Sequence, residues 1–248
     1  MHPREHKIME VIRFRWHAKY GHFLRAEANI NALSYPVPPR TAVLGLVGAL
    51  LGLDKDELAQ ELDSVQIAVA GRAPQRFWHR VKLRKDPPAA LPLRVRRTQS
   101  MRDGSTAEEK AALIRQEWLL APDFQIDLAW PQQPARLSEL TERLQQRRWH
   151  FTPCMGLSEL LAEVDFMERY TATPLAAGRY LITGICPAHT VKLLAGEGLG
   201  VHLLPLPYRV SPDRVFSHQA YYIERQGQPL PVETAAAWQV GEQVVVFA

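Results

Sequence analysis

The strongest constraint on the fold is the segment SYPVPPRTAVLGLVGALLG at residues 34–52. Its three prolines fix φ and keep the residues before them out of the α region, which predicts a stiff extended arm over residues 35–39. A helix is expected directly afterwards, with Thr41 as its N-cap. Residues 43–51 are apolar nearly all round, and interspersed glycines leave flat places where another backbone can approach. This helix should therefore be buried.

The junction of the arm and the helix has the chemistry of an anion site. Arg40 and the unpaired amide groups of the first helical turn would lie beside the rigid arm, an arrangement that suits a phosphate. A core helix introduced by a proline-stiffened loop would show the same pattern, so both interpretations stay open.

Positive charge is concentrated in residues 72–102. The whole chain carries +4 with neutral histidines, whereas this segment carries +9, which leaves the remainder near −5. Lys and Arg that neutralise phosphates gain affinity by releasing counterions, so a polyanion partner is expected. Phe77, Trp78 and His79 add flat faces on which bases can stack. A solvated basic loop without a partner is the alternative.

The periodicity of the rest predicts an α+β domain. Alternation from Val11 indicates a first strand with Ile12, Phe14 and Trp16 on one face and arginines on the other, a face that could bind RNA or only contact water. Further strands are expected at 65–70, 77–83, 93–98, 118–120, 124–130, 179–185, 190–194, 201–204, 220–223 and 244–247, and helices at 54–62, 106–116, 137–147 and 158–164. The prediction is an antiparallel sheet with helices on one side, a protruding basic β-ribbon and a β-rich C-terminal half.

The composition argues against a membrane-spanning, a secreted or a disulfide-rich protein. With 46% hydrophobic and 23% charged residues the chain is typical of a globular protein. No apolar run reaches the roughly eighteen residues of a membrane span, and no secretory signal is visible, so a cytoplasmic protein without membrane contact is expected. Cys154 and Cys186 are too few for a disulfide framework and lack metal-binding spacing. We expect one domain over residues 1–248 and no cofactor.

The evidence for catalysis in the sequence is weak. No phosphate-binding loop, dinucleotide fingerprint, nucleophile elbow, HExxH or CxxC motif occurs. His17 and His22 could act as base and acid in RNA cleavage, one deprotonating a 2′-hydroxyl and the other protonating the leaving oxygen. Nine scattered histidines produce such pairs by chance. A non-enzymatic role is therefore favoured, and a metal-independent endoribonuclease is the alternative.

Two separated motifs resemble the CRISPR-associated Cas5 family. The first runs from Phe23-Leu24-Arg25-Ala26-Glu27 through the proline arm into the helix that contains Gly45, and the second is Phe151-Thr152-Pro153-Cys154-Met155-Gly156-Leu157-Ser158-Glu159-Leu160. The resemblance covers most of the chain, although residues 72–102 match in character only. It implies an RRM-like, ferredoxin-like palm domain of the RAMP superfamily with a thumb, which we place at about residues 73–105.

The resemblance also implies a function. It suggests a non-catalytic, RNA-binding subunit of a type I CRISPR surveillance complex (Cascade), a ribonucleoprotein of antiviral defence, that binds and caps the 5′ handle of the crRNA. Its implied partners are the handle, the Cas7 backbone subunit, the large Cas8 subunit and, through the complex, target DNA. Relatives of subtype I-C cut precursor crRNA with a tyrosine in the helix after the arm and a Lys-His pair. Residues 43–53 contain no tyrosine and the sequence no Lys-His dipeptide, which disfavours self-processing.

RNA contacts are accordingly assigned to the arm and to the ribbon. Around the arm, guanidinium groups would take phosphates, a tyrosine would stack or hydrogen-bond and the helix start would add donors; these residues are Arg25, Tyr35, Arg40 and Thr41. On the ribbon, basic side chains would contact phosphates and an aromatic ring would wedge between nucleotides; these residues are Arg76, Phe77, Trp78, Arg80, Lys82, Arg84, Arg94, Arg96 and Arg97. A basic protein that binds a non-RNA anion is the alternative outside the family.

Overall fold

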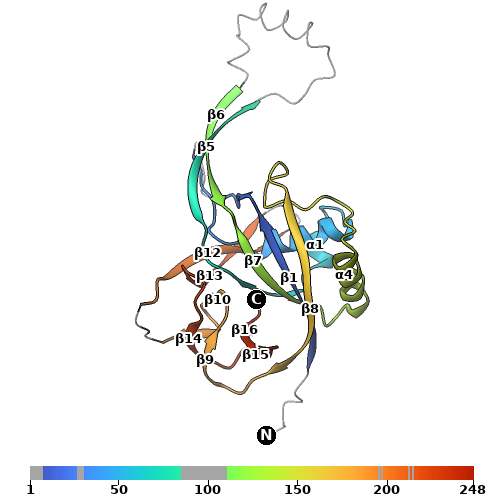
Figure 1. The fold of residues 1–248 in the computed structure, drawn as a ribbon, viewed down its shortest axis with the longest axis vertical. Coiled ribbons are helices and arrows are strands. Elements are labelled where there is room, and N and C mark those ends of the chain that lie inside the picture. Colours follow the sequence, from blue (N-terminus) through green and yellow to red (C-terminus); the bar gives the residue numbers. More distant parts are fainter. Residues whose placement is uncertain are drawn as a thin grey trace, which may run out of the picture.

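A computed structural model of the protein describes residues 8–26, 31–84, 111–194, 196, 198–211, 213 and 215–248, and within them all side chains except those of 83–84 and 111–112. A six-stranded sheet forms the centre, in the spatial order β16-β15-β8-β1-β7-β4 (Figure 1). Its strands are β1 (Met9–Ala18), β4 (Gln66–Ala70), β7 (Asp123–Ala129), β8 (Ala162–Pro174), β15 (Ala237–Val240) and β16 (Gln243–Val246). All neighbouring strands are antiparallel, as predicted.

Helices α1 (Arg40–Leu51) and α4 (Pro134–Gln146) cover one face of this sheet (Figure 1). The alternation along β1 directs Ile12, Phe14 and Trp16 to that face, where they share a core cluster with residues of both helices, such as Leu50 and Leu140. A short helix, α2 (Leu58–Glu61), occupies part of the helix predicted at 54–62. None of the helices in the described ranges is long and apolar enough to cross a membrane.

The proline arm is packed into the core. Tyr35 and Val37 are buried, and helix α1 begins directly after the arm at Arg40. The N-cap predicted at Thr41 is wrong, because Pro39 holds that position with extended backbone and makes no side-chain cap. The Pro39 carbonyl instead accepts hydrogen bonds from the amides of residues 42 and 43. The helix ends at Gly52, whose φ of 80° is accessible to a glycine without strain.

A long ribbon projects from the body (Figure 1). It consists of β5 (Gln75–Arg84) and β6 (Ala111–Leu120), which are antiparallel from the Gln75–Leu120 pair to the Arg84–Ala111 pair. Two short strands, β2 (Tyr20–Gly21) and β3 (Asn31–Ala32), pair with the other edge of β6. The helix predicted at 106–116 is wrong for residues 111–116, which lie in β6, because a continuous ladder with β5 outweighs their local helix propensity. Residues 106–110 and the strand predicted at 93–98 lie outside the described residues.

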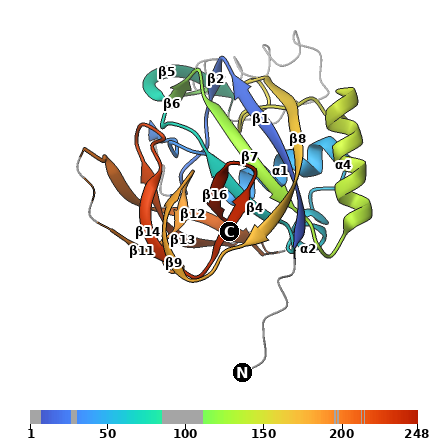
Figure 2. The same ribbon diagram turned by 60° about the horizontal axis from the view of Figure 1, so that its bottom comes forward.

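The C-terminal half is rich in strands, as predicted, and sits beside the six-stranded sheet (Figure 2). It contains two three-stranded sheets, in the orders β11-β14-β9 and β10-β13-β12, before β15 and β16 return to the central sheet. The strands are β9 (Gly178–Ile182), β10 (Cys186–Pro187), β11 (Val191–Leu193), β12 (Val201–Val210), β13 (Phe216–Glu224) and β14 (Leu230–Thr234). The helix predicted at 158–164 is wrong, because residues 158–160 form a turn and β8 starts at Ala162.

The sheet face opposite the helices is covered by packing at the Val11 end, and the arginines that β1 places on it are ion-paired. Val11 packs there with Val240 and Val245 of the C-terminal strands. Arg13 is buried and donates to both carboxylate oxygens of Asp127, from Nε at 2.6 Å and from Nη2 at 3.0 Å. Arg15 pairs with Asp123 at 2.7 Å, and this guanidinium lowers the pKa of the Asp123 carboxyl against the opposing effect of burial. The arginines of β1 are therefore neutralised within the sheet.

Candidate nucleic-acid interface

The ribbon has two chemically different faces because successive side chains of a strand point to opposite sides. Along β5, Arg76, Trp78, Arg80 and Lys82 alternate with Phe77, His79 and Val81. Arg80 lies directly across from Arg115 of β6. We call the side chains of Arg76, Trp78, Arg80, Lys82 and Arg115 the cationic face.

Three of the four basic residues on the cationic face have no carboxylate partner in the described part of the chain. Arg80, Lys82 and Arg115 are exposed, and the Arg115 guanidinium lies 5.0 Å from the centre of the Trp78 ring. The Trp78 side chain is itself 45% exposed. Exposed cations on the same face as an exposed aromatic ring match the two needs of a single-stranded nucleic acid, phosphate neutralisation and base stacking.

The opposite face of the ribbon is an aromatic cluster. Phe77 lies 5.5 Å from Tyr20 and 6.1 Å from Trp118 between ring centres, and His79 lies 4.2 Å from Trp118. These contacts join β5 and β6 to β2 through Tyr20. Phe77 and Trp78, which the sequence offered together as candidate wedges, thus lie on opposite faces, and only Trp78 belongs to the cationic face.

The base of the ribbon is tied through Glu117 to Ser34, the residue before the proline arm. Its buried carboxylate accepts hydrogen bonds from the backbone amide of Ser34, at 3.1 Å, and pairs with Arg76 at 3.2 Å. The Glu117 carbonyl accepts a hydrogen bond from Nδ1 of His22 at 2.9 Å, so Nδ1 carries the proton. Arg76 is therefore held by an acidic partner, unlike the other basic residues of the cationic face.

The two histidines considered for catalysis have different surroundings. His22 is only 1% exposed, and burial lowers its pKa, so the ring is neutral near pH 7. His17 is half-buried at the end of β1 and contacts Asp165 through Nε2 at 2.8 Å. No group of three or more metal-ligating side chains occurs within the ranges that the structure describes.

The structure places the arm residues mainly inside the protein. Tyr35 is 2% exposed, with its hydroxyl 3.5 Å from Nε2 of His218 and the Arg25 guanidinium 5.6 Å from its ring centre. Arg40 is 6% exposed, and its terminal nitrogens donate to backbone carbonyls of residues 63, 65 and 208 at 2.9, 2.7 and 3.3 Å. Burial lowers the pKa of this guanidinium. Arg40 thus directs its terminal donors to the protein's own backbone.

The two sequence motifs meet at a groove of about 600 Å³ beside the start of α1. Thr41 and Leu24 of the first motif line it together with Leu157 of the second. Gly156 makes this approach possible, because its φ of +92° favours glycine and a β-carbon there would collide with the carbonyl of His22. Residues more than a hundred positions apart are therefore adjacent in space.

The predicted site residues fall into four groups. The ribbon brings Arg76, Trp78, Arg80 and Lys82 together, whereas Phe77, Tyr35 and Arg40 are committed to internal packing. Thr41 lines the groove, and Arg25 lies over Tyr35 nearby. The side chain of Arg84 and residues Arg94, Arg96 and Arg97 lie outside the described part.

Arg115 and Glu117 were missed as site residues. Sequence reasoning assigned residue 115 to a helix, although the strand predicted at 118–120 could have been extended toward it. Their roles depend on residues of β5, because Arg115 lies across from Arg80 and Glu117 pairs with Arg76, and the sequence does not reveal these contacts.

Comparisons with known proteins agree with this architecture. A family model described as CRISPR-associated protein (Cas_Cas5) matches residues 11–227. A chain from a structure titled "CRISPR RNA-guided surveillance complex" superimposes with a TM-score of 0.54 and 14% identity, over 89% of this chain and 91% of the other. A CRISPR protein from Archaeoglobus fulgidus superimposes with a TM-score of 0.52 and 16% sequence identity. The match covers 96% of this chain and 98% of the other. These low identities show likeness of fold alone, and no curated protein matches.

Proposed function

Because the chain belongs to the CRISPR-associated Cas5 family, we propose that it is a non-catalytic subunit of a type I Cascade surveillance complex that binds and caps the 5′ handle of the crRNA. The observation that carries this proposal is the cationic face, where three exposed cations without carboxylate partners among the described residues share one side of the ribbon with an exposed tryptophan. The similar chain whose title names an RNA-guided surveillance complex supports assembly into such a particle. The proposed protein partners are the Cas7 backbone subunit and the large Cas8 subunit.

We infer that the central sheet is a ferredoxin-like palm and the ribbon its thumb. The succession β1-α1-β4-β7-α4-β8 follows the β-α-β-β-α-β motif, and the order β8-β1-β7-β4 with both helices on one face supports the assignment. The ribbon is inserted between β4 and β7. Because Arg13 and Arg15 on the face opposite the helices are already paired with aspartates, the RNA is assigned to the ribbon instead of to the sheet surface.

In this proposal each side chain of the cationic face has a distinct role. Arg80, Lys82 and Arg115 neutralise phosphates, and Trp78 stacks on a base. Arg76 holds the ribbon to Ser34 through Glu117. The buried Arg40 is left out of the interface because its terminal donors already bind carbonyls.

The environment of His22 argues against the two-histidine mechanism. A general acid or base must reach the substrate, and His22 is buried and hydrogen-bonded to the Glu117 carbonyl. His17 stays partly exposed beside Asp165, so it is the residue whose replacement tests the alternative. We propose that the handle is held and not cut, because the paired acid and base that cleavage needs are not both accessible.

The test is binding and cleavage of RNA in EDTA, with the purified protein and RNA that contains a CRISPR repeat. Tight binding of the handle without cleavage of the repeat-containing precursor is expected. Precursor cleavage that is lost in His17→Ala or His22→Ala would establish the endoribonuclease alternative. Equal affinity for the handle, a scrambled RNA and heparin would instead indicate a general anion-binding protein.

A further inference from the structure

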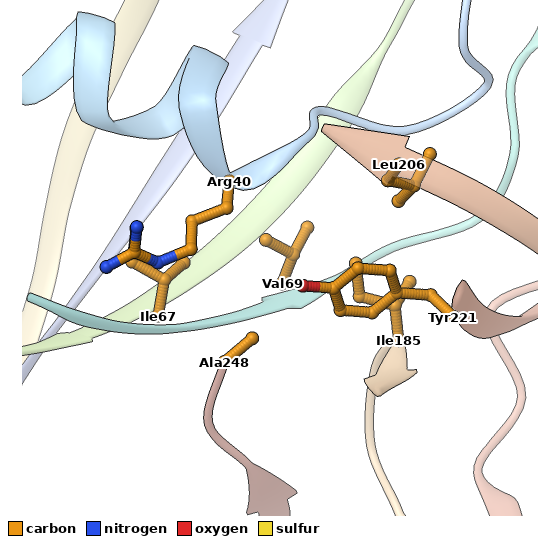
Figure 3. Close-up of a pocket in the computed structure, with 7 residues that line it drawn as sticks. All are labelled: Arg40, Ile67, Val69, Ile185, Leu206, Tyr221 and Ala248. Carbon is orange, nitrogen blue, oxygen red and sulfur yellow. The ribbon is translucent and has the colours of Figure 1, made fainter. Parts of the chain in front are cut away.

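A small cavity lies where the start of α1, the β4 strand and the C-terminal half meet (Figure 3). The volume of this cavity that is open to a water molecule is about 10 Å³, which is enough for one water. Most of the wall is aliphatic, and only two lining residues have polar side chains. The lining residues are Arg40, Ile67, Val69, Ile185, Leu206, Tyr221 and Ala248.

Both polar side chains of this wall leave an atom without a hydrogen-bond partner. The Nε of Arg40 and the hydroxyl of Tyr221 are buried, and neither has a partner among the described residues. The two residues are 6% and 2% exposed. Figure 3 shows the Tyr221 hydroxyl directed toward the Arg40 side chain across the space between them. Buried donors of this kind are almost always satisfied in native proteins, by protein groups or by ordered water.

The surroundings explain why Arg40 cannot correct this by rotating. Its two terminal nitrogens donate hydrogen bonds to three backbone carbonyls. Two of these, at residues 63 and 65, lie between α2 and β4, and the third, at residue 208, lies on β12. The guanidinium also lies 4.9 Å from the centre of the Tyr208 ring. The planar fork is therefore held, and its Nε–H direction is fixed with it.

We propose that this cavity is a binding site for one water molecule, which accepts a hydrogen bond from Arg40 Nε–H and forms a second hydrogen bond with the Tyr221 hydroxyl. The water extends the contacts of Arg40 from β12 to β13, so that this arginine of the proline-arm motif joins helix α1 to the C-terminal half. The size of the cavity excludes an organic ligand. The role is independent of RNA binding.

The first test is the stability of Tyr221→Phe, which removes the hydroxyl and retains the ring. If water bridges the two side chains, the variant loses a hydrogen bond and its Tm falls by about 2–4 °C, the shift expected for a chain of this size. If the hydroxyl is unsatisfied, its removal raises the Tm, and this result overturns the proposal. Tyr222→Phe, at the adjacent half-buried tyrosine, is the matched control and should leave the Tm unchanged.

A crystal structure of the full chain at about 1.5 Å resolution tests the site directly, even if the variant folds poorly. A density peak within hydrogen-bond distance of both atoms supports the proposal. An empty cavity, or a direct bond between the two side chains, overturns it. Crystals soaked in bromide distinguish water from an anion. An anomalous peak at the site would show that a halide occupies it and would overturn the proposal.

Discussion

Replacing Arg115 by glutamine tests whether the cationic face binds RNA phosphates. The change removes one charge and keeps a polar side chain of similar shape at the position across from Arg80. Each phosphate contact on a single strand contributes about −0.7 to the slope of log K against log salt. Losing one contact should therefore make the slope shallower by about 0.7. Between 50 and 200 mM salt, the affinity ratio of wild type to variant should then shrink by about 2.6-fold.

Two further variants give this measurement its specificity. Arg76→Gln should leave the slope unchanged, because Arg76 is engaged by Glu117, and should lower the Tm, because a buried carboxylate loses its partner. Arg179→Gln, at an exposed arginine on β9, removes the same charge far from the ribbon in sequence and is the control for general electrostatics. It should change neither the salt slope nor the Tm.

The assay is fluorescence anisotropy with labelled handle RNA at several KCl concentrations, combined with thermal melts of each variant. The reasoning is refuted if Arg115→Gln binds with the wild-type slope. It is equally refuted if Arg179→Gln lowers the slope as much as Arg115→Gln does, since the charge of the whole protein would then account for the effect.

Four other outcomes are expected. Trp78→Ala should weaken handle binding about 5- to 150-fold, the loss of one stacked base, with an unchanged salt slope in the same anisotropy assay. Asp127→Ala leaves the buried Arg13 without its bidentate partner and should lower the free energy of unfolding in urea by about 3–5 kcal/mol. Gly156→Ala should cost at least about 1–3 kcal/mol, measured in the same way, because of its positive φ and the collision with the carbonyl of His22. Burial lowers the pKa of His22 below 6.5, so the unfolded state binds a proton that the folded state excludes, and stability falls as the pH drops below about 6.5. The stability advantage of wild type over His22→Gln should therefore shrink between pH 7.5 and 5.5, and a constant difference would contradict this assignment.

The sequence predicted elements whose signal is local. Ile12, Phe14 and Trp16 reveal both the strand and its buried face, and Leu137, Leu140 and Leu144 do the same for α4. These patterns are visible because one face of each element packs against the core. The clustering of basic residues likewise indicated β5 as a candidate surface before its pairing was known.

The sequence could not reveal properties that depend on distant partners. Residues 111–116 have helix-forming composition, and the ladders with β5 and β3 make them a strand. Arg40 looked like a phosphate ligand because it stands at a helix start. Its actual acceptors include the carbonyl of Tyr208, 168 positions away, which no local pattern could identify.

Side chains of the ribbon alternate between two faces, and this alternation explains how the ribbon can project into solvent while its base stays fixed to the body of the protein. One set of side chains, including Phe77 and Trp118, packs with Tyr20 and fixes the base of the ribbon to β2. The other set, which includes Arg80, is left facing solvent. Glu117 adds a second attachment, to Ser34 before the proline arm, from the strand that carries Arg115. If the ribbon binds RNA as proposed, its paired strands fix the backbone from which these cations project, so less backbone conformational entropy is lost on binding than with a flexible basic loop.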